Sequence, residues 1–339
     1  MENLPSSRIQ ALHLWLNNQF SGENIQLTPL TGDAGFRRYY RFVIQGRSFI
    51  AVDAPKDKSN NAAFVFIQKS FSEHNVLVPE IIAADLSLGF LCLADLGETL
   101  LADILTPENI ALTYQKAIDI LPKIQSSIAN NSEKVPHYDQ AFVELELNIF
   151  SQWLLTEHLS IILSAEEQKQ LTRCFSILTE NMLSQPQVLV HRDYHSRNIM
   201  VLQDKTLGII DFQDAVIGPI TYDIVSLLRD CYLKWPSESV SLLLKRYIDV
   251  MTERYSLNDI TRQQWQRWFD LTGLQRHIKA SGIFARLHHR DNKSGYLKDI
   301  PLTLSYIVEI SQQYPELASL HQLLLIKVLP AMTNLKKER

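Results

Sequence analysis

Residues 191–198 read His-Arg-Asp-Tyr-His-Ser-Arg-Asn and stand between two apolar segments, VLV at 188–190 and IMV at 199–201. A loop that only joins two strands is usually a short turn made of residues such as glycine, asparagine and aspartate. This loop is long, basic and rich in histidine. The octapeptide therefore predicts a functional site held between two strands.

Three side chains in and after the octapeptide have a spacing that suits phosphoryl transfer. Four residues separate Asp193 from Asn198, and Asp211 comes thirteen residues after Asn198, at the end of the strand-like segment LGIIDF. A positioned carboxylate can take the proton of an attacking hydroxyl, and carboxylate and amide oxygens are ligands that suit Mg²⁺. The same order occurs in the catalytic loop of protein kinases. An ordinary turn is the alternative, but three acceptors in this order predict a site that uses ATP and Mg²⁺.

The composition of the chain narrows the class of protein. A length of 339 residues suits one large domain or two moderate ones, and 46% of apolar residues is enough to build a core. The formal net charge of −4 argues against a protein that mainly coats nucleic acid or an anionic membrane. We therefore expect neither nucleic acid nor membrane as a partner.

The cysteines and the N-terminus indicate a soluble, cytoplasmic protein. Cys92, Cys174 and Cys231 are far apart and form no C-x-x-C pair, so we expect buried free thiols in a reducing compartment. The first 20 residues lack the basic start, apolar run and cleavage site of a signal peptide. No uncharged apolar stretch of about 18 residues occurs, so no transmembrane helix is predicted.

The N-terminal part of the chain is predicted to be rich in strands. Ile9, Leu12, Leu16 and Phe20 recur at helical spacing and predict a helix over 7–20. β-branched and aromatic runs broken by turns then predict antiparallel strands. The expected strands are 25–30, 36–44, 47–54, 79–85 and 89–96, with one helix over 61–74.

After Gly97 the pattern changes to that of helices. The expected helices are 98–105, 107–129, 139–163 and 165–183, with more from 219 to about 327; the strand candidates between them are 187–190, 199–202 and 207–212. Strands and helices are segregated rather than alternating, so we expect an α+β fold. The predicted lobes are 1–96 and 97–339.

Two stretches carry a resemblance to a known superfamily. VLVHRDYHSRNIMV at 188–201 and LGIIDFQDAVIGPITYDIVSLLRD at 207–230 resemble the aminoglycoside phosphotransferase superfamily, which has the two-lobed protein-kinase-like fold. The resemblance spans nearly the whole chain. It implies that the small β-rich N-terminal lobe binds the nucleotide, and that the large, mainly helical C-terminal lobe carries catalysis and the acceptor.

Three further stretches resemble one subgroup of this superfamily. GDAGFRRYYRF at 32–42, VDAP at 52–55 and LQRHIKASGIFARLHHRD at 274–291 are similar to the anomeric N-acetylmuramate/N-acetylglucosamine kinases of bacterial cell-wall recycling. This implies an ATP- and Mg²⁺-dependent kinase for the C1 hydroxyl of one or both amino sugars in peptidoglycan recycling. The alternatives are a related kinase for an aminoglycoside, choline or another sugar, and an inactive nucleotide-binding regulator, against which the three acceptors argue.

The resemblance also implies roles for individual residues of the catalytic motif. Asp193 is the expected catalytic base, and Asn198 and Asp211 are the expected magnesium ligands. His191 and Asp223 are expected to support the catalytic loop.

For the nucleotide, the resemblance implies a hinge and a phosphate turn. In GFLCLADLG, the backbone carbonyl of Ala94 and the amide of Leu96 are expected to meet adenine. The turn from Gly32 to Phe36 is expected to lie over the phosphates.

One position departs from the kinase pattern. Asp53 stands about where protein kinases have the lysine that binds phosphate, and an acidic residue cannot neutralise phosphate. Arg37 or Arg38 of the neighbouring strand is expected to supply the charge, and we take Arg38 as the candidate. At most one of them can point to the nucleotide, because successive strand residues face opposite sides. The alternative is that solvent surrounds both.

A basic cluster is expected on the acceptor side. Arg276, Lys279 and Arg286 share a face if one helix spans them, and Arg290 follows. Arg276 is our candidate for binding the lactyl carboxylate of N-acetylmuramate, because a planar guanidinium matches a carboxylate with two hydrogen bonds. A solvated basic face is the alternative.

Two other pairs of residues are predicted to have ordinary roles. Trp265 and Trp268 are expected to be helix packing rather than a sugar platform. His288 and His289 diverge on a helix and are expected to lie at the surface rather than to chelate one ion.

Overall fold

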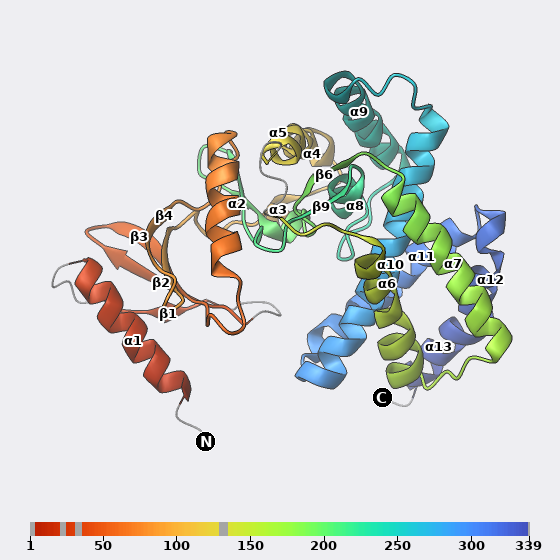
Figure 1. Cartoon of the computed structure of the whole chain (residues 1–339), viewed down its shortest axis with the longest axis horizontal. Coiled ribbons are helices and arrows are strands. Elements are labelled where there is room, and N and C mark those ends of the chain that lie inside the picture. Colours follow the sequence, from red (N-terminus) through yellow and green to blue (C-terminus); the bar gives the residue numbers. More distant parts are fainter. Residues whose placement is uncertain (1–3, 21–24, 31–35, 129–134, 338–339) are drawn as a thin grey trace. The chain divides into compact units, whose positions relative to one another are not determined.

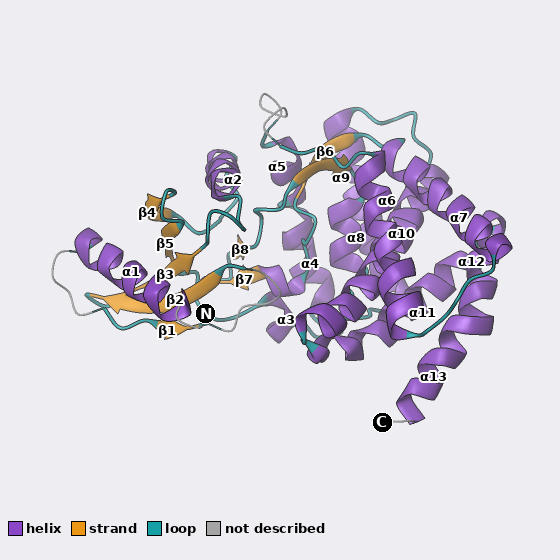
Figure 2. Cartoon of the chain, turned by 60° about the horizontal axis from the view of Figure 1, so that its bottom comes forward, coloured by secondary structure: helices purple, strands orange, loops and turns teal. Residues whose placement is uncertain are grey.

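The computed structural model describes residues 4–20, 25–30, 36–128 and 135–337, which divide into two units (Figure 1). The first unit comprises Met1–Leu105, Ser126–Val135 and Ser196–Ala215, and the second comprises Thr106–Gln125, Pro136–His195 and Val216–Arg339. The first contains most of the strands, whereas the second is mainly helical (Figure 2). The expected α+β class is therefore confirmed. The units are discontinuous along the chain, unlike the ranges 1–96 and 97–339 expected from the sequence.

A five-stranded antiparallel sheet organises the first unit, with the strand order β1-β2-β3-β5-β4. Its strands are β1 (Thr28–Pro29), β2 (Arg38–Ile44), β3 (Arg47–Asp53), β4 (Ile81–Asp85) and β5 (Phe90–Ala94). The hairpin from β2 to β3 turns at Gln45 and Gly46, whose φ angles are 50° and 75°. Two consecutive positive φ angles give the tight turn that matches the twist of the flanking strands.

Two helices cover opposite faces of this sheet (Figure 1). α1 (Leu4–Gln19) buries Leu12 and Leu16 against one face, in a cluster with Phe42 of β2. α2 (Asn61–Glu73) follows Asn60, whose side chain accepts the backbone N–H of Ala63 and caps the helix. The expected helices 7–20 and 61–74 are thus present with small shifts at their ends.

The strands that flank the octapeptide do not form a strand–loop–strand unit. β6 (Gln187–Val190) pairs with β9 (Val216–Pro219) in the second unit, whereas β7 (Ile199–Val201) pairs with β8 (Leu207–Ile209) in the first. The strands expected on either side of the octapeptide are present, but their pairing partners were not predicted, and β9 was missed. β9 is a buried four-residue segment, and its partner β6 lies 26 or more residues earlier in the chain, so local sequence gives little sign of the pairing.

The remaining elements are mostly helices. They are α3 (Leu101–Ile104), α4 (Ile110–Ile118), α5 (Leu121–Ser126), α6 (Gln140–Ile149), the π-helix η2 (Phe150–His158), α7 (Ala165–Leu183), the 3₁₀ turn η3 (Ser196–Asn198), α8 (Tyr222–Leu228), α9 (Ser237–Tyr255), α10 (Arg262–Asp291), η4 (Ser294–Asp299), α11 (Ile300–Ser311), η5 (Pro315–Leu317), α12 (Ala318–Leu323), η6 (Leu324–Val328) and α13 (Leu329–Lys337).

Three of the expected helices differ from those observed. The helix expected over 107–129 is divided into α4 and α5, because Pro122, near the start of α5, has no N–H to donate to the preceding turn. The helix expected over 139–163 changes from α6 to η2 and ends before Ser160, which has a φ of 51°. The helix expected over 98–105 is reduced to the single turn α3, whereas α7 matches its expected bounds.

The long helix α10 forms the centre of the second unit. It spans 30 residues and packs against α6, η2, α7, α8 and α11. Trp265 and Trp268 are 0% and 4% exposed, so the expectation that they serve packing is confirmed. Gly282 allows η2 to approach closely, because a Cβ atom there would lie 2.6 Å from the backbone nitrogen of Phe150.

Two expectations for the whole chain can be compared with the described residues. Cys92, Cys174 and Cys231 are free and buried, as expected. Among the described helices, none has the length and apolar character needed to cross a membrane.

Candidate active site

The first half of the catalytic motif is fixed in the second unit by a buried carboxylate. Asp223, in the first turn of α8, accepts the backbone N–H groups of His191 (2.8 Å) and Arg192 (3.0 Å). His191 is fully buried, and its Nδ1 accepts the backbone N–H of Asp193 at 3.3 Å. These contacts are the ones that the supporting roles of His191 and Asp223 require.

Arg192 reaches a second buried carboxylate, which the sequence analysis missed. It has a φ of 75°, and its Nη2 donates to Glu146 of α6 at 2.6 Å. Lys279 of α10 lies 2.8 Å from the same carboxylate, and Gln275 and Tyr138 also donate to it. Burial would raise the pKa of Glu146, but Lys279 and Arg192 outweigh burial and lower it to about 2.

A sequence signal for Glu146 exists but is weak. Val143, Glu146, Leu147 and Phe150 recur at the spacing of the buried face of a helix. An acidic residue on an apolar face indicates a buried partner, because an unpaired buried charge is costly. The sequence cannot name that partner, since Arg192 and Lys279 are 46 and 133 residues away.

Asp193 is held as an ionised carboxylate beside Arg276. The Asp193 side chain is 42% exposed, and its Oδ1 lies 3.5 Å from Nη1 of Arg276, which also donates to the backbone carbonyl of Arg192 at 2.7 Å. Burial would raise the pKa of Asp193, but Arg276, followed by Lys279 and His195, holds it well below its usual range. An ionised carboxylate can only accept hydrogen bonds, as a residue that takes a proton must.

Arg276, Lys279 and Arg286 all lie on α10, so the single helix assumed for them exists. The side chain of Arg276 is only 7% exposed and already contacts Asp193 and the carbonyl of Arg192. The structure therefore brings the expected acceptor ligand to the expected base.

The second half of the motif belongs to the first unit, because the chain changes unit between His195 and Ser196. Asn198 ends the turn η3, and its carbonyl accepts the N–H of Ile210 at 3.1 Å. Asp211 follows β8 with a φ of 65°, and its Oδ2 lies 3.4 Å from Nδ2 of Asn198. Gln213 donates to the other oxygen of Asp211 at 2.7 Å.

The residues present fit a magnesium ion. The side chains of Asn198 and Asp211 meet at the wall of one cavity and offer amide and carboxylate oxygens, which Mg²⁺ prefers. The described residues contain no cluster of three or more histidine, cysteine, aspartate or glutamate side chains around one point. Two protein ligands suit Mg²⁺, which usually keeps several waters and shares the phosphates of a nucleotide.

A cavity of about 520 Å³ lies within the first unit. Its volume is within the range of small-molecule sites. Its wall combines apolar side chains with the residues expected to form the hinge and to bind the metal: Leu30, Tyr39, Arg41, Ile50, Phe64, Pro79, Leu93, Ala94, Asp95, Leu96, Gly97, Glu98, Leu100, Arg197, Asn198, Met200, Ile210, Asp211, Phe212 and Gln213. The expected hinge residues Ala94 and Leu96 thus share one cavity with Asn198 and Asp211.

The hinge is held in place by Asp95, whose role the sequence analysis missed. Its carboxylate accepts the Ser48 hydroxyl (2.6 Å), Nε of Arg41 (2.6 Å) and the backbone N–H of Gly97 (2.9 Å). Gly97 has a φ of 96°, where other residues are strained. Within the described part of the chain, the amide of Leu96 has no backbone acceptor, so it is available to a ligand.

Of the other expected nucleotide residues, the structure describes Phe36 and Arg38, and neither lines this cavity. Gly32 lies outside the described residues. Phe36 is 63% exposed, and the Lys58 ammonium lies 5.1 Å from its ring centre. Arg38 is exposed and does not line the cavity.

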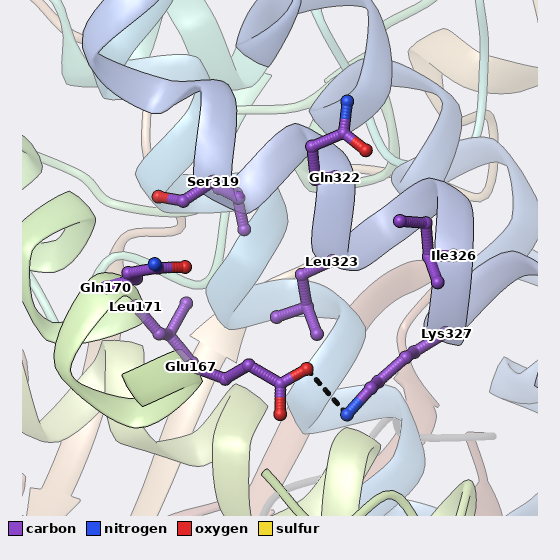
Figure 3. A pocket seen from close by; sticks show the side chains of 9 residues that line it. Glu167, Gln170, Leu171, Ser319, Gln322, Leu323, Ile326 and Lys327 are labelled. Carbon is purple, nitrogen blue, oxygen red and sulfur yellow. Dashed lines mark ion pairs between the residues drawn. The ribbon is translucent and has the colours of Figure 1, made fainter. Parts of the chain in front are cut away.

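A small pocket in the second unit has no relation to the motif (Figure 3). Side chains from α7, α12 and η6 line it, and Glu167 and Lys327 form an ion pair there at 2.6 Å. Its volume of about 100 Å³ is below the range of small-molecule sites, so we assign it no ligand.

The paired histidines belong to a surface group. Nε2 of His289, which is exposed, lies 3.0 Å from Nδ1 of His158 at the end of η2. The surface position expected for both histidines is thus observed for His289, whereas His288 is half-buried.

Comparison with known proteins assigns the family. Residues 26–257 match the model of the phosphotransferase enzyme family. The N-acetylmuramate/N-acetylglucosamine kinase of Pseudomonas aeruginosa is 37% identical, over 94% of this chain and 96% of its own length. The enzyme of the same name from Neisseria meningitidis serogroup B is 36% identical, over 91% and 93%.

Solved structures agree on the fold. Choline kinase LicA from Streptococcus pneumoniae has a TM-score of 0.62 at 11% identity and covers 88% of this chain and 99% of its own. A thermostable mutant of aminoglycoside phosphotransferase APH(4)-Ia has a TM-score of 0.59 at 13% identity, covering 88% and 98%. The chain therefore belongs to the phosphotransferase enzyme family and has the kinase-like fold of that family.

Proposed function

We propose that the protein transfers the γ-phosphoryl group of ATP to the anomeric C1 hydroxyl of N-acetylmuramate and N-acetylglucosamine. The names and nearly full-length similarity of the curated relatives support this acceptor class. Such a reaction belongs to the recycling of peptidoglycan sugars in the cytoplasm, where ATP is available.

The ionised state of the Asp193 carboxylate supports the choice of the C1 hydroxyl. Arg276 and its neighbours keep this carboxylate ionised and make it a weak base. A carboxylate accepts a proton more easily from an acidic hydroxyl than from an ordinary alcohol, because the difference between the two pKa values is smaller. The anomeric hydroxyl of a free sugar is more acidic than an ordinary alcohol, so it fits Asp193 better than the other sugar hydroxyls.

The remaining residues have the following proposed roles. Ala94 and Leu96 contact adenine through the backbone, and Asn198 and Asp211 hold Mg²⁺. When bound, Mg²⁺ supplies positive charge at the phosphates. The chain's own contribution is to orient the acceptor hydroxyl at Asp193 and to keep that carboxylate ionised.

The role of Arg276 is open to a direct test. Its contacts support a role in holding Asp193. Arg276→Ala should then reduce the use of both sugars alike, whereas a selective loss for N-acetylmuramate would support binding of the lactyl carboxylate.

A panel of acceptors tests the proposed function. The protein is assayed with ATP, Mg²⁺ and N-acetylmuramate, N-acetylglucosamine, its methyl glycoside, an aminoglycoside or choline, and products are identified by ³¹P NMR. We expect sugar 1-phosphates from the two free sugars and no product from the methyl glycoside, which is blocked at C1. Turnover of the glycoside would place the reaction on another hydroxyl. Turnover of choline or of the aminoglycoside, but of neither amino sugar, would favour a related kinase. No turnover of any acceptor would favour an inactive nucleotide-binding protein.

A further inference from the structure

The structure shows why Asp53 cannot stand in for the phosphate-binding lysine. Asp53 is 1% exposed, and its carboxylate pairs with Arg8 of α1, with a distance of 2.8 Å from Arg8 Nε. Its side chain therefore points to the face of the sheet that α1 covers. On the cavity face, β3 contributes the apolar Ile50, so this strand supplies no cation to the cavity.

The alternation of β2 separates the two arginines that could replace the lysine. Tyr39 and Arg41 line the cavity, whereas Tyr40 and Phe42 pack in the core with α1. Arg38 pairs in register with Asp53, on the face of Tyr40. Arg37 immediately precedes β2 and, by the same alternation, lies on the face of Tyr39 and Arg41.

Aromatic rings hold Arg37 near the expected metal site. Its guanidinium carbon lies 5.5 Å from the ring centre of Phe64, a cavity residue of α2. Phe64 stacks on Phe212 at 4.9 Å, and Phe212 directly follows Asp211.

Arg37 also has unused capacity to bind an anion. Its hydrogen bond from Nη2 to the carbonyl of Asn60 is long at 3.5 Å. Nε of Arg37 is buried and has no hydrogen-bond partner among the described residues. No carboxylate in the described ranges lies within ion-pair distance of it, whereas Arg8 and Arg41 of the same unit are both paired.

Two other basic residues, Arg41 and Arg197, line the cavity itself. Arg41 is neutralised by Asp95 at 2.6 Å and by Glu98, and these contacts fix it at the hinge. Arg197 precedes Asn198 in the turn η3 and is the competing candidate.

We propose that Arg37 binds the terminal phosphates of ATP and replaces the lysine of other kinases. A planar guanidinium can give two parallel hydrogen bonds to a phosphate, and its stacking on Phe64 restricts it in advance. This inference rests on the proposed use of ATP.

The test compares nucleotides that differ only in phosphate. Calorimetry measures the affinities of the full-length protein for MgATP and for adenosine, and their ratio reports the phosphate contribution. Arg37→Ala should lower the affinity for MgATP about 10- to 100-fold, the range for a hydrogen bond to a charged group, and change that for adenosine less than about twofold. Retained adenosine binding also shows that the variant is folded.

Arg47→Ala is the matched control. Arg47 lies on the same sheet, and its guanidinium carbon is the same 5.5 Å from the ring centre of Phe49, but Phe49 packs in the core with α1, whereas Phe64 lines the cavity. Arg47→Ala loses the same kind of ring contact as Arg37→Ala but no contact near the cavity. Its ratio of MgATP affinity to adenosine affinity should therefore equal that of the wild type.

Three outcomes would overturn the inference about Arg37 but not the proposed function. They are an unchanged ratio of MgATP affinity to adenosine affinity in Arg37→Ala, or a lower ratio that appears instead in Arg38→Ala or in Arg197→Ala. If Arg37→Ala does not fold, Arg37→Lys and Arg37→Gln replace it. Arg37→Lys should retain part of the phosphate contribution. A ratio of MgATP affinity to adenosine affinity in Arg37→Gln that equals the wild-type ratio would contradict the inference. A wild-type protein that binds neither MgATP nor adenosine would overturn the proposed function itself.

Discussion

At the scale of single residues, Asp193 has the clearest predicted effect. Asn has nearly the shape of Asp but cannot accept a proton, so Asp193→Asn should keep the fold and lower kcat about 10²- to 10⁴-fold. Affinity for ADP should not change, because the cavity residues belong to the first unit and Asp193 to the second. Steady-state kinetics and ADP calorimetry check both parts. Full activity in the variant would contradict the assignment of Asp193.

Asp211 should have a different signature, because it is expected to bind metal rather than a proton. Asp211→Asn removes a ligand charge and should raise the Mg²⁺ concentration for half-maximal rate by at least about tenfold. Asp204→Asn is the control, since Asp204 lies in the turn between β7 and β8, where it accepts the N–H of Thr206, and it does not line the cavity. An unchanged magnesium titration of Asp211→Asn would remove it from the metal site.

At the scale of elements, the contact between α10 and η2 depends on one glycine. A Cβ at position 282 would lie 2.6 Å from the nitrogen of Phe150 and 2.7 Å from the carbonyl carbon of Ile149. Backbone atoms cannot move aside singly, so the two helices must separate. Gly282→Ala should lower the free energy of unfolding by about 1–3 kcal/mol or more, the cost of overpacking, despite the better helix propensity of alanine.

Gly273 on the same helix provides the matched control. A Cβ there would meet Nη1 of Arg229 at 3.3 Å, the end of a long side chain. Gly273→Ala should therefore be near neutral or stabilising by up to about 1 kcal/mol, as expected for glycine replaced by alanine in a helix. Chemical denaturation measures both variants, and equal effects at the two positions would show that helix propensity alone is at work.

At the scale of the whole molecule, the buried ion pairs predict how stability depends on pH. The pKa of Glu146 is about 2 in the folded protein, below its ordinary value of about 4.3 in an unfolded chain. The folded state thus binds fewer protons, so this contribution to stability is present above about pH 4–5 and is lost as pH falls toward 2. Asp193, whose pKa is also lowered, acts in the same direction.

Glu146→Gln isolates this contribution. At pH 7 it should lower the free energy of unfolding by about 3–5 kcal/mol, because Arg192 and Lys279 lose a buried partner. As pH falls from about 5 toward 2, the difference from the wild type should shrink, because the unfolded wild-type chain binds a proton at Glu146 and the stability that the ion pairs give the folded state is lost. Glu144→Gln, at an exposed position of α6, should show no difference at either pH. A difference that stays constant with pH would contradict the ion-pair account.

The sequence by itself determined the class of fold and the chemical groups of the candidate site. Helical and alternating patterns are local, so α7 and the hairpin from β2 to β3 could be predicted from neighbouring residues. The spacing of Asp193, Asn198 and Asp211 likewise reflects chemistry that needs these residue types in this order.

Only the tertiary structure decided which residues support those groups. β6 pairs with β9, and Glu146 forms ion pairs with Arg192 and Lys279, which are 46 and 133 residues away in the chain. The face of a strand is also decided by packing: α1 covers one side of the sheet, and this leaves Arg37 rather than Arg38 beside the cavity. Such partners are chosen by burial and charge in three dimensions, and residues far apart in the chain leave no local pattern that reveals them.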